Sequence, residues 1–383
     1  MRIARAALAV VLLLVAALVF IPAPQILIWR FKLITIEFGH WLALGPLAII
    51  ACSRWRSRVD RITTVLAGMA AGMLLSGSVR AAWFSRKAGA TMDVEFPAPA
   101  DRKGSPFSFM RLWSVGSPAP MEMRTFDFAS HEGAPLKPDF YRAQGRTPAP
   151  CVVVIPGGGW DSCDRGGFAE MNRHLAHRGC AVAAMDYRLA PRWRWPAQKE
   201  DVLSALAFLK ARSRELGLDP ERFILLGRSA GAQIAGAVSA TGEHPEIIGC
   251  IMIYGPADMH FAAKYADPSD ILDSGKLLRQ YLGGTPAEFA SSYDSASAYG
   301  LAGARTPPTL LLHGAGDEIV WPRQSERFAD RLLGLGVRHA FLRLPWATHA
   351  FDYNFNGPGG QLEAWAVGRF LDSVTATPRS ARH

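Results

Sequence analysis

The stretch FILLGRSAGAQIAGAVSA, residues 223–240, holds a G-x-S-x-G motif between two unlike segments. Before the motif, the apolar run Phe223–Leu226 is typical of a buried strand; after it, Ala230–Ser239 has the length and composition of a helix. The two glycines of such a motif let a strand turn sharply into a helix and leave the serine hydroxyl exposed at the turn. The context therefore predicts that Ser229 is a nucleophile. The alternative is a structural serine in a glycine-rich turn.

An alternation of strands and helices surrounds this motif from residue 151 onward. The expected strands are Cys151–Ile155, Ala181–Met185, Phe223–Leu226, Gly249–Tyr254, Thr309–Leu312 and Ala340–Leu344. The expected helices are Phe168–Arg178, Lys199–Leu216, Ala230–Ser239 and Pro322–Leu335. Nearly continuous apolar strands separated by helices predict a parallel sheet covered on both faces. In such sheets, reactive groups gather on the loops at the carboxyl ends of the strands.

Two further side chains stand in such loops. TLLLHGAGDEIV, residues 309–320, places Asp317 after a strand, and FLRLPWATHAFD, residues 341–352, places His349 after the last one. A serine nucleophile needs a base, and the base needs an orienting carboxylate. The chain order Ser, Asp, His is that of α/β-hydrolases. Glu318 and Asp258 are the competing carboxylates, and His313 is interpreted as a packing and hydrogen-bonding residue.

A glycine cluster follows the first of these strands, in VVVIPGGGWDS, residues 152–162. It lacks the spacing of a phosphate-binding loop and of a dinucleotide fingerprint, and its following acidic residues disfavour a phosphate. A nucleotide site is therefore excluded here.

From about residue 137 to the last helix, the chain resembles the esterase branch of the α/β-hydrolase superfamily. That branch includes hormone-sensitive-lipase-like enzymes and the bifunctional feruloyl and acetyl-xylan esterase-like group. The motifs that carry the resemblance are DYRLAPRWRWPAQKEDVLSALAFLK, residues 186–210, LDPERFILLGRSAGAQIA, residues 218–235, and YLGGTPAEF, residues 281–289. The resemblance implies an α/β-hydrolase fold with a small cap.

The resemblance also assigns the glycine cluster. The family's oxyanion loop usually reads H-G-G-G-W, and here it begins with Pro156. By resemblance, the backbone N–H groups of Gly158, Gly159 and Ala230 would hold the oxyanion. Proline removes only its own N–H, so the departure affects the anchoring of the loop and leaves these donors in place.

We therefore expect a serine carboxylesterase acting on small-molecule esters through an acyl-enzyme, with no metal or organic cofactor. Ser229 is the expected nucleophile, His349 the base and Asp317 the orienting carboxylate, while Trp160 and Trp346 are expected to shape the substrate pocket. The acyl or alcohol preference stays open among short-chain esters, acylated glycans and methyl esters of prenylated cysteine. Two alternatives are a serine peptidase of the same fold and a catalytically inactive hydrolase-fold protein that only binds.

The first ninety residues carry three apolar runs, at 6–28, 33–52 and 62–84, and are expected to form about three transmembrane helices. A cleaved signal peptide is the alternative for the first run, which lacks a convincing cleavage site. Gly68 and Gly72 form a G-x-x-x-G that would favour close helix approach. Residues 91–120 are expected to be a linker, and 121–377 the catalytic domain with a cap at about 260–304.

Charge is distributed unevenly along the chain. The formal net charge of +9 lies entirely in residues 1–90, so the catalytic region is balanced and a nucleic-acid partner is excluded. The three expected spans predict a multi-pass cell-membrane protein. Six basic residues lie on the side of the membrane that holds the N-terminus and the loop between the second and third spans, and five lie on the opposite side. This difference favours an extracytoplasmic catalytic domain. Among five cysteines, Cys163 and Cys180 are candidates for a disulfide in an oxidising compartment.

Overall fold

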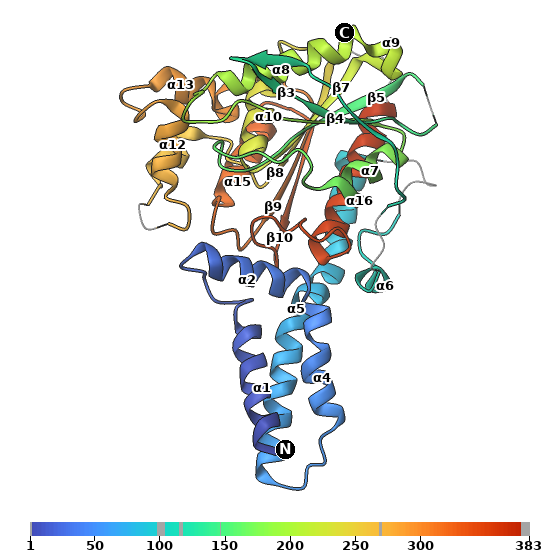
Figure 1. Cartoon of the computed structure of the whole chain (residues 1–383), viewed down its shortest axis with the longest axis vertical. Coiled ribbons are helices and arrows are strands. Elements are labelled where there is room, and N and C mark those ends of the chain that lie inside the picture. Colours follow the sequence, from blue (N-terminus) through green and yellow to red (C-terminus); the bar gives the residue numbers. More distant parts are fainter. Residues whose placement is uncertain (1, 98–103, 115–117, 146, 268–269, 377–383) are drawn as a thin grey trace.

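An eight-stranded sheet forms the centre of the catalytic region (Figure 1). The computed structural model describes residues 2–97, 104–114, 118–145, 147–267 and 270–376. In sheet order the strands are β1 (Met123–Thr125), β4 (Pro138–Tyr141), β6 (Ala181–Met185), β5 (Ala149–Ile155), β7 (Leu218–Arg228), β8 (Ile247–Ile253), β9 (Thr309–Gly314) and β10 (His339–Leu344). The pairs β1–β4 and β4–β6 are antiparallel and the rest are parallel. A separate hairpin pairs β2 (Ala129–His131) with β3 (Ala134–Leu136).

Helices cover both faces of the sheet, because alternate residues of each strand point to opposite sides. Val153 of β5 belongs to one buried cluster, whereas Val152 and Val154 belong to the other. The first face carries α8 (Ala197–Ala211), α10 (Ala230–Ala240) and α15 (Arg323–Gly334), with α9 (Ser213–Leu216) at the end of α8. The second face carries α7 (Ala169–His177), α16 (Pro358–Ala376) and the last turns of α5 (Arg58–Glu95). The predicted mostly parallel sheet, covered on both faces, is confirmed.

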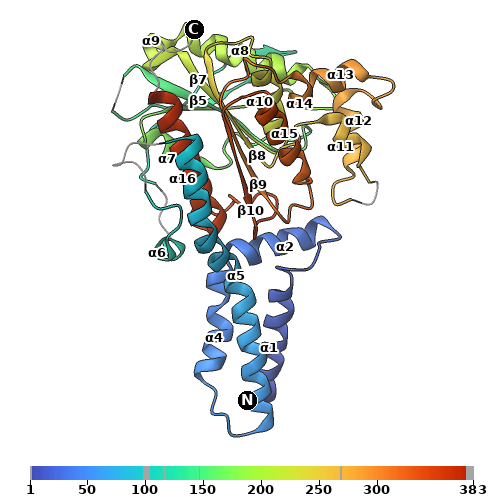
Figure 2. The same ribbon diagram turned by 180° about the vertical axis from the view of Figure 1, so that it is seen from behind.

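A stalk of helices projects from the catalytic region (Figures 1 and 2). It contains α1 (Arg2–Ala17), the short helices α3 (Gly39–Leu42) and α4 (Leu44–Ala51), and the first half of α5. Between stalk and sheet, α2 (Ile26–Glu37) lies across the stalk direction, bent by 79° from the α3–α4 pair.

The expectation of about three transmembrane helices is not confirmed. In the described residues, one helix, α5, is long and apolar enough to cross a membrane, and the bent pair of α2 with α3–α4 would make a second. The first expected span, 6–28, is interrupted because α1 ends at Ala17, and the second, 33–52, is broken at Phe38. These helices are consistent with membrane association, although core helices of soluble proteins meet the same test.

The stalk continues into the catalytic region without a break at residue 91. Helix α5 runs to Glu95, and Phe84, Ala88 and Met92 on its last turns are buried against the sheet cluster that also contains α16. Residues 91–95, expected to begin a linker, are therefore helical, because the sheet provides an apolar surface for them. Parts of the expected linker, 98–103 and 115–117, and residue 377 of the expected catalytic domain lie outside the described residues.

Close helix contact in the stalk uses a different glycine from those of the G-x-x-x-G. A side chain at Gly39 would place its Cβ 2.2 Å from the carbonyl oxygen of Leu74, so α3 approaches the backbone of α5 closely. Gly68 and Gly72 face open space, with no atom within 4 Å of an added Cβ among the described residues.

Short helices form the segment between β8 and β9, where the cap was expected. They are α11 (Met259–Lys264), α12 (Ser274–Leu282), α13 (Ala290–Ser295) and α14 (Ala298–Leu301). Residues 268–269 of this segment lie outside the described residues. Helix α6 (Phe109–Leu112) lies near the stalk, and its Leu112 is buried in the cluster that contains α16.

The two cysteines considered for a disulfide are free thiols. Cys163 packs against the buried cluster on one face of the sheet and Cys180 belongs to the cluster on the other. The sheet between them explains why the suggested disulfide is absent from the structure.

Candidate active site

Ser229 stands at a sharp turn between β7 and α10. Its backbone has φ 51° and ψ −118°, a conformation that costs about 1–3 kcal/mol for a residue other than glycine. Two close backbone contacts hold this turn: a Cβ on Gly227 would lie 2.1 Å from the oxygen of Gly231, and one on Gly231 would lie 2.1 Å from the oxygen of Ile155. The glycines are thus required by backbone packing, and the strained turn presents the Ser229 hydroxyl beyond the sheet edge.

The imidazole of His349 links Ser229 to Asp317. His349 Nε2 lies 3.0 Å from Ser229 Oγ, and Nδ1 lies 2.7 Å from Asp317 Oδ2. If Nδ1–H donates to the carboxylate, Nε2 is left as an acceptor for the serine hydroxyl. The structure thus brings together all three side chains that the sequence singled out, from the ends of β7, β9 and β10.

Asp317 is fixed on every side by donors. Its Oδ1 accepts the backbone N–H groups of Ile319 and Val320, both at 2.9 Å, and His313 Nε2 lies 3.2 Å from Oδ2. Burial alone would raise the pKa of the Asp317 carboxyl, but His349 and His313 outweigh it and lower the pKa below its ordinary value. Asp317 is therefore ionised at neutral pH. His313, expected to be a packing and hydrogen-bonding residue, is buried and contacts this carboxylate.

The competing carboxylates have other partners. Asp258 caps α11 by accepting the N–H of Phe261 at 2.9 Å and pairs with Arg327 at 2.9 Å. Glu318 faces α2, where its carboxylate pairs with Lys32 at 2.5 Å. Neither is recorded in contact with His349.

The glycine cluster faces the nucleophile. Gly158 has φ +127° and Gly159 has φ +61°, and a Cβ on Gly158 would lie 2.3 Å from the oxygen of Ser162. Ser162 ties the loop by donating its N–H and Oγ–H to the oxygen of Gly158, at 3.0 and 2.7 Å. Within the described part of the chain, the N–H groups of Gly158, Gly159 and Ala230 have no recorded hydrogen-bond acceptor, and all three residues line the cavity beside Ser229.

The two tryptophans expected at the pocket differ in position. Trp160 lines the cavity, stacks on Tyr281 of α12 with ring centroids 4.5 Å apart, and donates to Gln233 Oε1 at 2.9 Å. Trp346 does not line it: its ring packs against Phe84 of α5, 5.9 Å between centroids. The expectation for Trp346 is wrong, because α5 supplies an apolar surface that the sequence analysis assigned to a membrane span alone.

A cavity of about 1010 Å³ opens beside Ser229. Its lining includes Phe261, Tyr265 and Leu277 from the segment after β8, together with Phe168 and Phe355. Its apolar lining, with a few polar groups converging on Ser229, is typical of a small-molecule site. Among the described residues, no group of His, Cys, Asp and Glu side chains is placed to hold a metal ion.

A buried charged cluster that sequence analysis missed lies beneath the nucleophile. Arg228, the residue before Ser229, pairs through Nε with Asp352 at 2.5 Å and through Nη2 with Glu363. Tyr254 donates to Asp352 at 2.6 Å and packs on His349 with 4.5 Å between ring centroids. The arginine inside G-R-S-A-G was the available signal, but its two partners lie far along the chain.

Helix α2 also reaches the site. Trp29 donates its indole N–H to Thr348 Oγ1 at 3.3 Å, and Ile26 and Trp29 line the cavity. Nothing in the local sequence distinguishes α2 from a membrane segment, so its contact with the loops of Asp317 and His349 was not expected.

Comparison with known proteins identifies relatives of this region. The profile of the BD-FAE family matches residues 139–332. The "Probable carboxylic ester hydrolase LipM" of Mycobacterium tuberculosis is 30% identical over 242 residues, covering 60% of this chain and 55% of that protein. The "Probable isoprenylcysteine alpha-carbonyl methylesterase ICMEL1" of Oryza sativa subsp. japonica is 29% identical over 234 residues, covering 55% of this chain and 53% of that protein. The chain thus spans about half the length of the curated relatives it matches.

Solved structures show the same fold. The esterase LipW of Mycobacterium marinum superposes with a TM-score of 0.56 at 24% identity, covering 80% of this chain and 91% of its own. The catalytic region therefore has the α/β-hydrolase fold that the resemblance implied.

Proposed function

Because the chain belongs to the BD-FAE family, and because Ser229, His349 and Asp317 meet beside its main cavity, we propose that it is a serine carboxylesterase. The observation that carries the proposal is the 3.0 Å contact between Ser229 Oγ and an imidazole whose other nitrogen faces a buried carboxylate. Hydroxyl, base and orienting group stand in the order that acyl transfer requires.

In the proposed reaction, Ser229 Oγ attacks the carbonyl carbon of the ester while His349 Nε2 takes the hydroxyl proton. The tetrahedral intermediate collapses when the bond to the alcohol oxygen breaks, and His349 Nε2 donates its proton to that oxygen as the alcohol leaves. Water then attacks the acyl-enzyme with His349 again as base, releasing the carboxylic acid and restoring the Ser229 hydroxyl. The ionised Asp317 stabilises the imidazolium in both steps.

The negative charge that develops on the carbonyl oxygen needs donors. The N–H groups of Gly158, Gly159 and Ala230 line the cavity without recorded acceptors, so we assign them to the oxyanion hole. One such donor contributes roughly 3–4 kcal/mol to transition-state stabilisation.

The substrates we propose are carboxylic esters with an apolar acyl or alcohol part. Phe261, Tyr265, Leu277, Phe168 and Phe355 give the cavity apolar lining. The relatives are named as a carboxylic ester hydrolase and a prenylcysteine methylesterase, and both names describe ester hydrolysis.

A panel of p-nitrophenyl esters from acetate to palmitate, beside a peptide p-nitroanilide, tests this function. Hydrolysis of esters with burst release of p-nitrophenol is expected. Hydrolysis of the anilide alone would instead support a peptidase. Turnover of none of these compounds would overturn the proposed activity.

We further propose that the stalk inserts into a bilayer. Between Arg61 and Arg80 the helix α5 carries no charged residue, a distance of about 28 Å at 1.5 Å per residue, close to the roughly 30 Å of membrane hydrocarbon. Most of the exposed large apolar side chains among the described residues belong to the stalk and α2. Such a surface favours a lipid environment.

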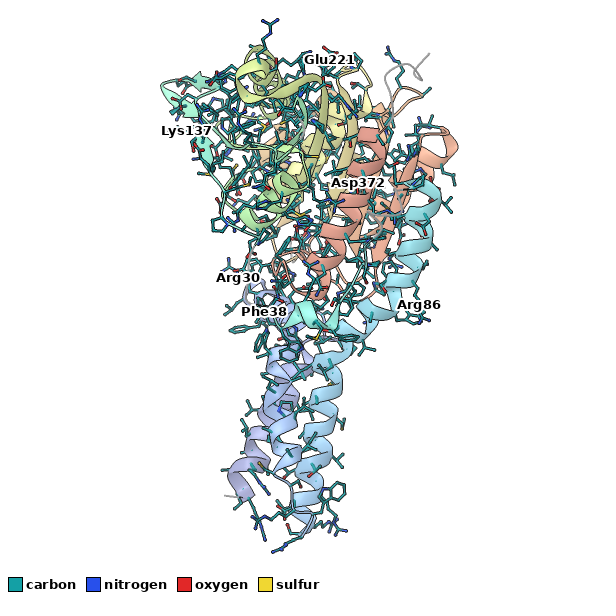
Figure 3. The ribbon with its side chains drawn as sticks, turned by 90° about the vertical axis from the view of Figure 1, so that its right-hand side faces the viewer. Arg30, Phe38, Arg86, Lys137, Glu221 and Asp372 are labelled. Carbon is teal, nitrogen blue, oxygen red and sulfur yellow. The ribbon has the colours of Figure 1, made fainter. Side chains whose placement is uncertain are left out.

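Both ends of this apolar stretch carry exposed tryptophan and basic residues, as is typical at membrane interfaces. Trp55 lies near one end and Trp83 near the other, with side chains 60% and 71% exposed. Figure 3 shows Arg30, Phe38 and Arg86 at the level where stalk and catalytic region meet. We propose three helical passes formed by α1, α3–α4 and α5, with the catalytic domain outside the cytoplasm. A reporter fused after His383 tests this orientation. Reporter activity found only in the cytoplasm would overturn it.

A further inference from the structure

Helix α2 has two distinct faces, and the inner one belongs to the catalytic region. Trp29, Leu33 and Ile36 are buried, and Lys32 is buried beside Glu318. Ala23, Trp29 and Leu33 form a cluster with residues after β9 and β10 and with Ile271 of the β8–β9 segment. The helix is thus seated on the loops that carry Asp317 and His349.

The same helix forms one wall of the cavity. Ile26 and Trp29 line it, together with the exposed side chains of Tyr265, Leu272 and Trp321. Because Ile26 also packs against the cluster that contains Ile271, the apolar part of the cavity's rim adjoins the start of α2. A molecule passing this rim stays in contact with apolar side chains.

The outer face of α2 is also apolar. Leu27, Phe31 and Ile34 are 59%, 54% and 43% exposed, and Arg30 lies exposed among them. Helix α2 leads through Phe38 into α3, at a bend of 79°, and Trp41 of α3 is also exposed. Apolar and aromatic side chains mixed with a basic residue are what an interfacial helix presents to lipid.

The rest of the rim restricts the charge of a substrate. Asp161, Asp164 and Asp270 line the cavity, whereas Arg228, the one cation that lines it among the described residues, is paired with Asp352 and Glu363 beneath Ser229. Acidic groups at the rim repel anions. An uncharged ester fits this rim better than a fatty-acid-like or phosphate-bearing one.

From these four observations we infer that α2 lies in the membrane interface and that the esterase takes uncharged, bilayer-dissolved esters past Ile26 into its cavity. The inference rests on the proposed esterase activity and adds the substrate class and the route of entry. The bilayer concentrates the ester, and the cavity receives it without passage through water.

The test compares two esters in the full-length protein reconstituted in vesicles of palmitoyl-oleoyl-phosphatidylcholine. p-Nitrophenyl butyrate is supplied in water and p-nitrophenyl palmitate is dissolved in the vesicle membrane. The variant Leu27→Gln/Phe31→Gln makes the outer face of α2 polar without touching the cavity lining. Leu333→Gln, on the last turn of α15, replaces an equally apolar side chain that is 71% exposed away from α2.

We expect the α2 variant to lose about tenfold in the rate on the embedded palmitate, because two apolar side chains no longer hold the rim in the interface. Its rate on butyrate should match that of wild type, and Leu333→Gln should match wild type on both esters. Vesicle flotation should show that all three proteins stay membrane-bound. Equal losses on both esters, or no loss on palmitate, would overturn the inference alone. Failure of the wild type to hydrolyse either ester would overturn the esterase proposal and the inference with it.

Discussion

The ammonium group of Lys32 lies 2.5 Å from the carboxylate of Glu318, the residue that directly follows Asp317. Glu318 also accepts the backbone N–H of Ala23 at 3.1 Å, so the turn before α2 and the helix itself are tied to the Asp317 loop. On the other side of the site, Trp29 contacts Thr348, the residue before His349. Helix α2 and the turn before it thus contact the loops that carry both partners of Ser229, Asp317 and His349.

This arrangement predicts that Lys32 and Glu318 act as positioning residues. Lys32→Met or Glu318→Gln alone leaves the other group without its charged partner, so each should lower both the melting temperature and kcat. Because the side chains are in contact, the double variant should be less harmful than the sum, by about 1–3 kcal/mol in a double-mutant cycle. The cycle is measured by thermal unfolding in detergent and by p-nitrophenyl butyrate hydrolysis. Strictly additive effects would show that the pair does not act as a unit.

Ser229→Ala should abolish hydrolysis, with a loss of about a millionfold in kcat, because no other hydroxyl takes the place of a triad serine. A fluorophosphonate probe should label the wild type and leave the variant unlabelled. Ser204→Ala is a matched control, since that hydroxyl donates to the backbone oxygen of Glu200 one turn earlier in α8 and does not line the cavity. Labelling that persists in Ser229→Ala would refute the assignment of the nucleophile.

The loop that begins with Pro156 separates backbone donors from side-chain anchoring. Pro156→His restores the family's usual residue and leaves the glycine N–H groups in place, so activity should stay close to that of wild type. Gly158→Ala forces a Cβ to 2.3 Å from Ser162 and should lower kcat about a hundred- to thousandfold by moving a donor. Circular dichroism should show both variants folded. The opposite ranking of the two activities would contradict the backbone assignment.

The sheet and its loops were predictable because their signals are local. Runs such as Cys151–Ile155 mark buried parallel strands, and reactive side chains at strand ends converge by the geometry of the sheet. Ser229, Asp317 and His349 could therefore be chosen from the amino-acid sequence alone. Ser229 directly follows β7, Asp317 lies three residues after β9, and His349 lies five residues after β10.

The role of the N-terminal helices was not predictable in the same way. Hydropathy gives the same signal for a helix in lipid, a helix in an interface and a helix on an apolar sheet. The last turns of α5 bury Phe84 and Met92 against the sheet, and α2 turns its inner face to the active site. Both contacts join segments more than two hundred residues apart, which no local pattern encodes.

Arg228 beneath Ser229 faces two carboxylates and has charge for only one. Asp352 contacts its Nε at 2.5 Å and also accepts a hydrogen bond from Tyr254 at 2.6 Å. Burial, with repulsion from Asp352, raises the pKa of Glu363 to about 8, although Arg228 opposes the shift. Glu363 is then protonated at neutral pH in the folded protein, whereas in the unfolded chain it ionises near its ordinary pKa of about 4.3.

A folded-state pKa above the unfolded one means that the folded protein binds the extra proton, so stability falls as pH rises toward 8. For one group this predicts a loss of about 2 kcal/mol in the free energy of unfolding between pH 6 and pH 8. Glu363→Gln, which resembles the protonated acid in both states, should be more stable than wild type by about 2 kcal/mol at pH 6, and it should lose less by pH 8. Urea unfolding in detergent measures both, with the exposed Glu243→Gln as control. Wild type and Glu363→Gln should not lose stability in parallel over this range if the assignment holds. A parallel loss would show that Glu363 is ionised in the folded protein and that Arg228 pairs with two negatively charged carboxylates.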